Sequence, residues 1–256
     1  MVIEQSVAGS GRVVVVGHRG AMGYAPENTL PSFAKAAELG VQAVECDVHL
    51  TRDGEVVVIH DDRVERTSDG EGAVADMTLV ELKRLDFGSR FAPCYAGTRI
   101  PTLSEALQSA RELGLDIIVE IKGEPEPARE LVARAVALIG DEGMRQRAAI
   151  ISFHHPCLLW AREADPAIAT GILYSRGTAD PLGEARAFSA TSIRPHHSRV
   201  SAELARQVHD AGLCLHTWTV DDEGLVLSLI GAGVDSIACN FPDRAISLLR
   251  RLGRLA

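Results

Sequence analysis

The stretch AVECDVHLTRDGEVVVIH, residues 43–60, is the part of the sequence that indicates the fold most directly. It opens with a β-branched apolar run that is typical of a buried strand. Glu45 and Asp47 interrupt this run at alternate positions, so both carboxylates project from one face of the strand. Asp53-Gly54 then predicts a hairpin turn, and Val56–His60 is predicted to return antiparallel to the first strand.

Short apolar runs of the same kind recur along the chain and alternate with helical patterns. The expected strands are Val13–Val16, Gln42–Val48, Asp116–Ile121, Ala148–Ser152, Ile168–Leu173, Thr191–Arg194, Cys214–Trp218 and Asp235–Ala238. Between most of them apolar residues recur at helical spacing, as in Ala128–Ile139, Ala202–Ala211 and Glu223–Ala232. Alternating strands and helices predict a parallel sheet, and eight such units predict an α/β fold, the closed (β/α)8 TIM barrel.

A doubly wound open sheet is the alternative architecture. It usually carries a glycine-rich fingerprint after the first strand, and Gly17-His18-Arg19-Gly20 is not one. A barrel requires about 250 residues, so the chain is expected to form a single domain over residues 1–256. The hairpin and a small insertion after the second strand interrupt the alternation over approximately residues 51–110. Within them the insertion extends from about Asp61 to Ile100, with a helix near Leu79–Leu85.

The composition restricts the class of protein. The formal net charge is −9 and no basic cluster appears, which argues against a nucleic-acid or anionic-membrane surface. The five cysteines are scattered and form no CxxC pair, so neither a disulfide framework nor a zinc knuckle is expected. Met1–Arg12 shows no signal peptide, and no apolar run approaches the roughly 20 residues that span a bilayer. These features predict a cytoplasmic protein without stable membrane insertion.

Charged residues that interrupt the apolar strands mark the expected site. Glu120 and Lys122 share one face of the third expected strand, as Glu45 and Asp47 do on the second. Barrel enzymes place their sites at the carboxyl ends of the strands, where these residues lie. Three carboxylates make an all-oxygen site that suits Mg2+, Ca2+ or Mn2+ better than zinc. The alternative is a metal-free cluster in which Lys122 neutralises Glu120 and Glu45.

Two histidines and two cationic side chains are expected beside these carboxylates. His18 follows the first strand and His60 ends the return strand, and imidazoles are the usual acid and base near neutral pH. Arg19 and Lys122 can supply positive charge to phosphate or carboxylate oxygens. Lys122 is one of only three lysines in the chain, which suggests a specific need for an ammonium group. Trp218 lies near another carboxyl end, either in the core or against a substrate.

Together these residues resemble the glycerophosphodiester phosphodiesterase family over nearly the whole chain. The shared motifs are His18-Arg19-Gly20, Pro26-Glu27-Asn28-Thr29-Leu30, Glu45-Cys46-Asp47-Val48, Thr51-Arg52-Asp53-Gly54, Val58-Ile59-His60-Asp61, Arg66-Thr67, Ile100-Pro101-Thr102-Leu103, Glu120-Ile121-Lys122, Ser152-Phe153, Trp218-Thr219-Val220 and Asn240-Phe241-Pro242. Each motif is weak alone, whereas their order and spacing together are specific. One departure is Asp221, which stands where the family often has Asn and bears on the expected headgroup preference.

The resemblance implies a barrel with a small insertion after the second strand and a divalent cation, Mg2+ or Ca2+, with Mn2+ as a further candidate. It implies these roles: Glu45, Asp47 and Glu120 as metal ligands, His18 and His60 as the acid–base pair, Arg19 and Lys122 as phosphate contacts, Trp218 as a substrate-side aromatic, and Glu27 and Asn28 as supporting residues. The implied reaction is metal-dependent hydrolysis of small-molecule glycerophosphodiesters to glycerol 3-phosphate and an alcohol.

Two other functions are compatible with the same motifs. A lysophospholipase D-type activity on a lipid-bearing diester would call for an apolar groove, and aromatic residues are only 4% of the chain. A catalytically silent phosphodiester-binding protein would be signalled by loss of a motif histidine or carboxylate, and all are present. Hydrolysis of simple glycerophosphodiesters is therefore the leading hypothesis.

Overall fold

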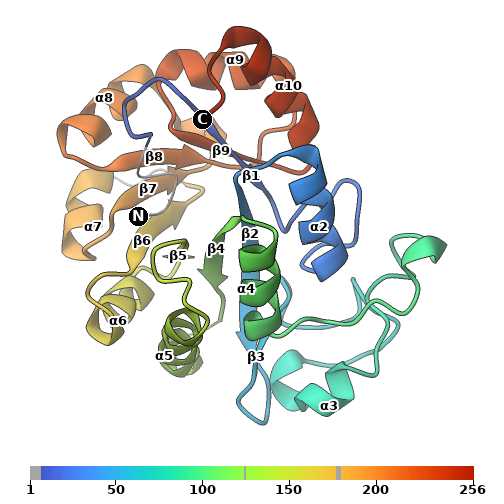
Figure 1. Ribbon diagram of the computed structural model, residues 1–256. Helices are drawn as coiled ribbons and strands as arrows, with labels where there is room; N and C mark the ends of the chain where they lie inside the picture. Colours follow the sequence, from blue (N-terminus) through green and yellow to red (C-terminus); the bar gives the residue numbers. More distant parts are fainter. Residues whose placement is uncertain (1–6, 124, 177–179) are drawn as a thin grey trace.

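The computed structural model describes residues 7–123, 125–176 and 180–256. The first six residues of Met1–Arg12, the segment considered for a signal peptide, lie outside this description. Figure 1 shows the strands arranged as a ring, with helices around the outside. Among the described residues, no helix is both long and apolar enough to cross a membrane.

The strands form a closed parallel barrel. They are β1 (Val14–Gly17), β2 (Ala43–Leu50), β4 (Asp116–Ile121), β5 (Ala148–Ser152), β6 (Ala169–Tyr174), β7 (Ser192–Pro195), β8 (Cys214–Thr217) and β9 (Ser236–Cys239). Neighbours pair in the order β1, β9, β8, β7, β6, β5, β4, β2, and β2 pairs again with β1 to close the ring. The predicted TIM barrel is confirmed, and each strand begins and ends within two residues of its expected bounds.

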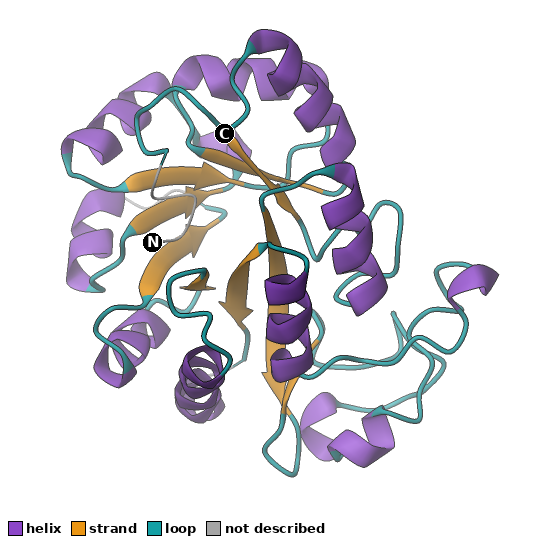
Figure 2. Ribbon diagram, in the orientation of Figure 1, coloured by secondary structure: helices purple, strands orange, loops and turns teal. Residues whose placement is uncertain are grey.

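Helices cover the outer face of the barrel, as Figure 2 shows. They are α2 (Leu30–Leu39), α4 (Leu103–Glu112), α5 (Pro125–Asp141), α6 (Pro156–Ala164), α7 (Pro181–Ala187), α8 (Ala202–Asp210), α9 (Glu223–Ala232) and α10 (Pro242–Leu252). Their starts follow from local side chains. Thr102 caps α4 in a capping box with Glu105, and Ser201 caps α8 by accepting from the backbone N–H of Leu204.

Strand parity divides the buried side chains into two cores. The larger core lies between strands and helices, and β2 contributes Val44, Cys46 and Val48 to it. The smaller core fills the barrel interior and includes Val14, Val16, Ala43, Ile118, Ile151 and Leu173. Burying a side chain of this size contributes about 1.5–3 kcal/mol to stability. Glu45 and Asp47 have the inward parity, so the apolar packing of β2 directs both carboxylates into the barrel.

The hairpin and the insertion follow β2. Strand β3 (Val56–Val58) pairs antiparallel with β2 and ends two residues before the predicted limit at His60. The insertion has its own small core, which is formed by Val57, Ile59, Val64, Val74, Leu82, Phe87 and Ile100. It contains the short helices η1 (Val74–Asp76), α3 (Leu79–Leu82) and η2 (Pro93–Tyr95). Helix α3 is shorter than the predicted Leu79–Leu85 because the chain tightens, with Leu85 N–H donating to the carbonyl of Leu82.

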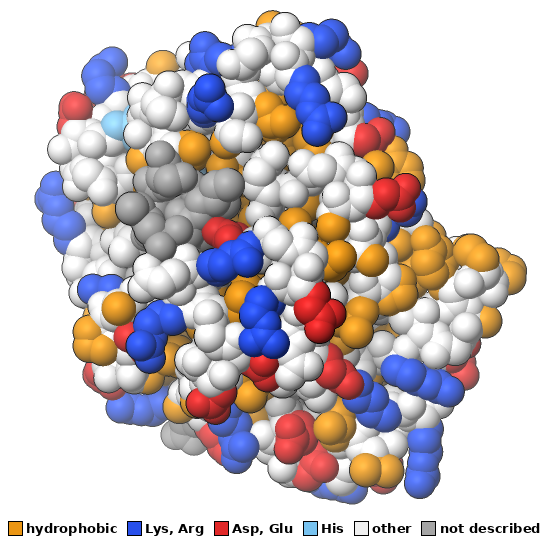
Figure 3. Space-filling model, in the orientation of Figure 1, with side chains coloured by type: hydrophobic (Ala, Val, Ile, Leu, Met, Phe, Trp, Pro, Cys, Tyr) orange, Lys and Arg blue, Asp and Glu red, His pale blue; other side chains and the backbone are white. Residues whose placement is uncertain are grey.

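Two predictions from composition can be compared with the structure. Among the described residues, which include all five cysteines, no disulfide is formed, and only Cys94 is exposed. On the face shown in Figure 3, blue Lys and Arg side chains are interspersed with red Asp and Glu side chains. The described part of this face therefore presents no extended basic surface of the kind that nucleic acid requires.

Candidate active site

A cavity opens at the carboxyl ends of the barrel strands. One wall is polar and includes His18, Arg19, Glu45, His60, Glu120 and Lys122. The apolar part of the lining includes Val16, Ile118, Ile151, Phe153, Leu173 and Trp218. The charged residues predicted on separate strands are therefore brought together at one cavity, the place where a barrel enzyme binds its substrate.

The turn after β1 fixes the first part of the site. A Cβ atom at Gly17 would collide with the carbonyl oxygen of Gly20, and one at Gly20 would collide with Ser32 of α2. Arg19 has a left-handed backbone with φ of 49°, and its carbonyl accepts a hydrogen bond from Ser32 Oγ at 2.9 Å. This tight turn directs the Arg19 N–H to Glu45 Oε2 at 3.0 Å. The two glycines thus allow the loop to approach both α2 and the acidic strand.

Three acidic side chains converge at the cavity. Glu45 and Asp47 come from β2 and Glu120 from β4, where Asp47 and Glu120 are partners in the parallel register. All three are buried, and one carboxylate oxygen from each lies within 4.8 Å of the others. The predicted convergence of carboxylates from two strands is confirmed.

The nearby cations both contact Asp47. Arg19 Nε lies 3.2 Å from Asp47 Oδ2, and Lys122 Nζ lies 2.9 Å from Asp47 Oδ1 and 2.5 Å from Glu120 Oε1. Asn28 Nδ2 also donates to Asp47 Oδ2 at 2.8 Å. Burial opposes ionisation of Asp47, but Lys122 and Arg19 outweigh it and lower the pKa of Asp47 to about 2. Asp47 is therefore a compensated anion.

Glu45 and Glu120 carry the uncompensated charge of the cluster. Burial and the neighbouring Asp47 raise the pKa of Glu120 to about 7, although Lys122 opposes the change. Burial, Asp47 and Glu120 raise the pKa of Glu45 well above its usual range. Within the described residues, no donor reaches the buried Oε1 of Glu45. Glu45 thus has a buried oxygen without a hydrogen-bond donor, and Glu45 and Glu120 both have raised pKa values. These features fit a bound hard divalent cation better than an ion-pair cluster that neutralises itself.

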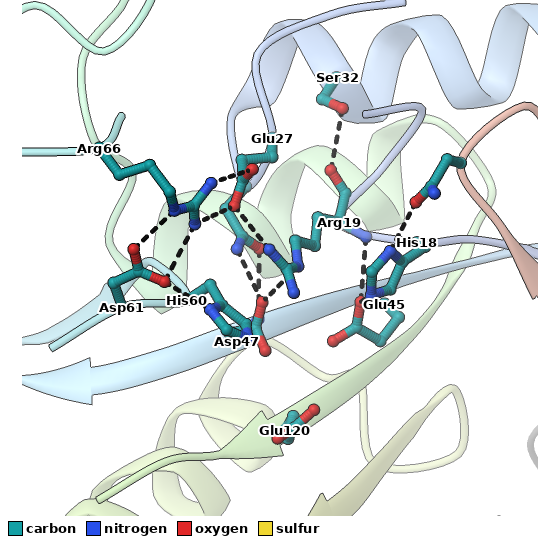
Figure 4. A network of polar contacts seen from close by, with 12 residues as sticks. His18, Arg19, Glu27, Ser32, Glu45, Asp47, His60, Asp61, Arg66 and Glu120 are labelled. Atoms are coloured by element: carbon teal, nitrogen blue, oxygen red, sulfur yellow. Dashed lines mark hydrogen bonds and ion pairs between the residues drawn. The ribbon is translucent and has the colours of Figure 1, made fainter. Parts of the chain in front are cut away.

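The two motif histidines lie on different sides of the acidic cluster, as Figure 4 shows. His18 Nε2 is 3.9 Å from Glu45 Oε2, and its Nδ1 is 2.7 Å from Asn240 Oδ1. Burial and the neighbouring Arg19 lower the pKa of His18. His60 Nδ1 lies 2.6 Å from Asp61 Oδ1. Both imidazoles line the cavity, and each has its second ring nitrogen held by a polar partner.

A chain of ion pairs behind the cavity escaped the sequence analysis. Arg66, from the insertion, donates to Asp61 Oδ2 at 2.6 Å and to Glu27 Oε2 at 2.7 Å. Glu27 Oε1 in turn accepts from Arg19 at 2.8 Å, which links the His60 side of the site to the cation beside Asp47 (Figure 4). Glu27 does not line the cavity, so it supports Arg19 from behind. The sequence showed Arg66 only as part of the motif Arg66-Thr67, and its contact with Glu27 spans 39 positions of the chain.

The aromatic part of the lining comes from the carboxyl ends of β5 and β8. Trp218 lines the cavity, donates through Nε1 to the carbonyl of Arg194 at 2.9 Å, and packs edge-on against Phe153 at 5.5 Å. His216 and Arg194 also line the cavity, from β8 and β7, although no sequence pattern pointed to a role for either. Asp221 does not line the cavity, so the structure gives no direct contact through which Asp221 would influence headgroup preference.

Comparison with known proteins agrees with this geometry. The family model of the glycerophosphoryl diester phosphodiesterases matches residues 18–244. A glycerophosphodiester phosphodiesterase of Caldanaerobacter subterraneus is 36% identical over 242 residues, which cover 94% of this chain and 100% of the relative. A solved structure of an Oleispira antarctica phosphodiesterase, in complex with the product sn-glycerol-3-phosphate, is 31% identical with a TM-score of 0.88, and the match covers 95% of this chain and 99% of the other. The chain therefore belongs to the glycerophosphoryl diester phosphodiesterase family.

Proposed function

We propose that this protein hydrolyses glycerophosphodiesters to glycerol 3-phosphate and an alcohol, with a divalent cation and with His18 and His60 as the acid–base pair. The observation that carries the proposal is the buried carboxylate cluster at a cavity lined by both histidines, in a chain of this family. The relative from Oleispira antarctica, whose product is sn-glycerol-3-phosphate, supports the same product for this chain.

Glu45, Asp47 and Glu120 are the residues that would hold the cation. Their all-oxygen donor set favours Mg2+ or Ca2+, with Mn2+ as a further candidate, over zinc. When bound, such an ion supplies positive charge that stabilises the phosphoryl oxygens as charge gathers on them. Asn28 supports this role indirectly, because its side chain fixes the Asp47 carboxylate through Nδ2.

Arg19 and Lys122 are proposed to contact the phosphate. Both line the cavity, and both are held in place by Asp47, Arg19 at 3.2 Å and Lys122 at 2.9 Å. Fixed donors of this kind stabilise the charge of the transition state without reorganising. Trp218, in the apolar part of the lining, would pack against an apolar part of the substrate.

The two histidines would move the protons of the reaction. An attacking oxygen, from water or from the neighbouring hydroxyl of the glycerol, forms a bond to phosphorus while the bond to the alcohol oxygen breaks. Attack by water gives glycerol 3-phosphate directly, whereas attack by the glycerol hydroxyl gives a cyclic phosphate that a water molecule then opens to glycerol 3-phosphate. One imidazole takes the proton of the attacking oxygen, and the other gives a proton to the departing alkoxide. Each transfer is worth about 10²–10⁴-fold in rate.

The test is release of glycerol 3-phosphate from glycerophosphocholine and glycerophosphoethanolamine, with Mg2+, Ca2+ or EDTA. We expect metal-dependent release that His18→Ala and Glu45→Ala each reduce by about 10²-fold or more. Glu163→Ala is the matched control, because Glu163 is 63% exposed and pairs with Arg129 on the surface. Absence of release from folded protein with every metal would reject simple headgroup diesters and make lysolipids the next substrates to assay.

A further inference from the structure

A hydrogen-bonded chain lies behind His18, on the side away from the carboxylates. His18 Nδ1 is 2.7 Å from Asn240 Oδ1, and Asn240 Nδ2 donates to Asp221 Oδ2 at 2.7 Å. Asp221 Oδ1 also accepts from the backbone N–H groups of Asn240 at 2.7 Å and Phe241 at 3.1 Å. Asn240 follows β9, and His18 follows β1, so closure of the barrel between these strands brings the chain together.

The direction of these hydrogen bonds follows from the chemistry of the groups. An ionised carboxylate only accepts, so the NH₂ end of the Asn240 amide must face Asp221. The carbonyl end, Oδ1, then faces His18 and can only accept. The hydrogen at the His18–Asn240 contact must therefore come from His18 Nδ1. In the neutral ring this leaves the lone pair on Nε2, the nitrogen on the side of Glu45.

We propose that Asp221 and Asn240 are positioning residues that hold the proton of neutral His18 on Nδ1, so that Nε2 is the atom that takes the proton of the attacking oxygen. The assignment of His18 as the base rests on the proposed function, whereas the assignment of the tautomer does not. His60, the other member of the pair, would then give the proton to the departing alcohol.

A single substitution at Asp221 tests the direction of the hydrogen bonds in this chain. Asp221→Asn keeps the size of the side chain and an oxygen for the backbone N–H groups of Asn240 and Phe241. It also places an NH₂ group against the NH₂ group of Asn240. Rotation of the Asn240 amide relieves this contact but turns an NH₂ group toward His18, which moves the ring proton to Nε2. We expect kcat to fall roughly 10–100-fold with KM changed less than about 2-fold.

Exchanging the residues at positions 221 and 240 should restore the hydrogen-bond pattern that keeps the proton on His18 Nδ1. In Asp221→Asn combined with Asn240→Asp, the amide at position 221 again accepts from the backbone through its oxygen, and its NH₂ group donates to the carboxylate at position 240. That carboxylate in turn accepts from His18 Nδ1. We expect kcat within about 3-fold of the original protein. Asp222→Asn is the matched control, because Asp222 caps α9 through the N–H of Leu225 and does not contact Asn240, and Asn caps a helix as well as Asp.

The tautomer itself is read from 15N NMR of histidine-labelled protein at about pH 8.5, where imidazoles are neutral. The His18 signals are identified by their loss in His18→Gln. The proposal requires a proton on Nδ1 in the original protein and the double exchange, and a proton on Nε2 in Asp221→Asn. A proton on Nε2 in the original protein overturns it, as does an Asp221→Asn variant with both tautomer and kcat unchanged. If the original protein releases no glycerol 3-phosphate, the proposed function fails while the NMR result still decides the positioning.

Discussion

Removing the charge of Glu120 should stabilise the metal-free protein while destroying its ability to bind the cation. Glu120 is buried, and Lys122 bridges it to Asp47; burial with the neighbouring Asp47 raises the pKa of Glu120 to about 7. Ionisation of this carboxyl therefore costs free energy in the folded protein that it does not cost in the unfolded chain. Glu120→Gln removes that cost and keeps an oxygen that can accept from Lys122.

The magnitude follows from the change in pKa. The interval from the ordinary value of 4.5 to about 7, at about 1.4 kcal/mol per pH unit, corresponds to about 3 kcal/mol. For a chain of this length each kcal/mol moves the melting temperature by about 2–4 °C. We therefore expect Glu120→Gln to melt roughly 6–12 °C above the original protein in EDTA at about pH 8.

The pH dependence gives the sign of the effect. The folded protein holds the Glu120 proton more tightly than the unfolded chain, so this residue costs stability progressively as pH rises from about 4.5 to about 7. Melting curves in EDTA should therefore show a difference that corresponds to less than about 1 kcal/mol at about pH 5 and is fully developed at about pH 8. With Mg2+ at about 100 times its dissociation constant, the original protein should gain about 2.7 kcal/mol and the variant should gain nothing.

Asp47→Asn is the contrasting variant. Arg19 and Lys122 lower the pKa of Asp47 to about 2, so its ionised form stabilises the fold and its loss should cost about 2 kcal/mol at neutral pH. Glu163→Gln, on the surface, should change little. If Glu120→Gln melts at or below the original protein in EDTA at about pH 8, Glu120 is compensated without metal and the reasoning about excess charge is wrong.

Three further outcomes are expected. Arg66→Met, which removes the contacts to Asp61 and Glu27, should lower kcat roughly 10-fold while changing stability by less than about 1 kcal/mol, as measured by steady-state kinetics and chemical denaturation. Trp218→Ala should raise KM more than it lowers kcat in the same assay, since the side chain belongs to the apolar part of the cavity lining. A thiol reagent should modify Cys94 rapidly in the native protein and the four buried cysteines only after unfolding.

The barrel and the carboxylates were predictable because both depend on strand parity. Glu45 and Asp47 alternate with Val44, Cys46 and Val48, and burial of the apolar set against the helices leaves the acids only the barrel interior. The hairpin was predictable from Asp53-Gly54 for a similar reason, since a local turn sets the register. Both signals are formed by residues within a few positions of one another, so they can be recognised from the sequence alone.

The long-range polar contacts behind the site, unlike the local pair of His60 with Asp61, were not predictable in the same way. Asn240 lies 222 positions from His18, and their contact exists only because β1 and β9 close the barrel. Arg66 reaches Glu27 from an insertion whose path no periodicity describes, 39 positions along the chain. Hydrogen bonds between distant loops depend on atomic geometry at the ends of strands, whereas a hydropathy pattern describes only which faces are buried.

The charges around the cavity suggest why the cluster keeps an excess of anions. Glu45, Asp47 and Glu120 with Arg19 and Lys122 give a formal charge of −1 when all are ionised. A divalent cation changes this to +1, which matches the single negative charge of a phosphodiester. A third cationic side chain would neutralise the cluster, and the metal-free protein would then be more stable while the cation would bind less tightly. Because both contact Asp47, they stay fixed for the phosphate, and the instability of Glu45 and Glu120 remains available as free energy of metal binding.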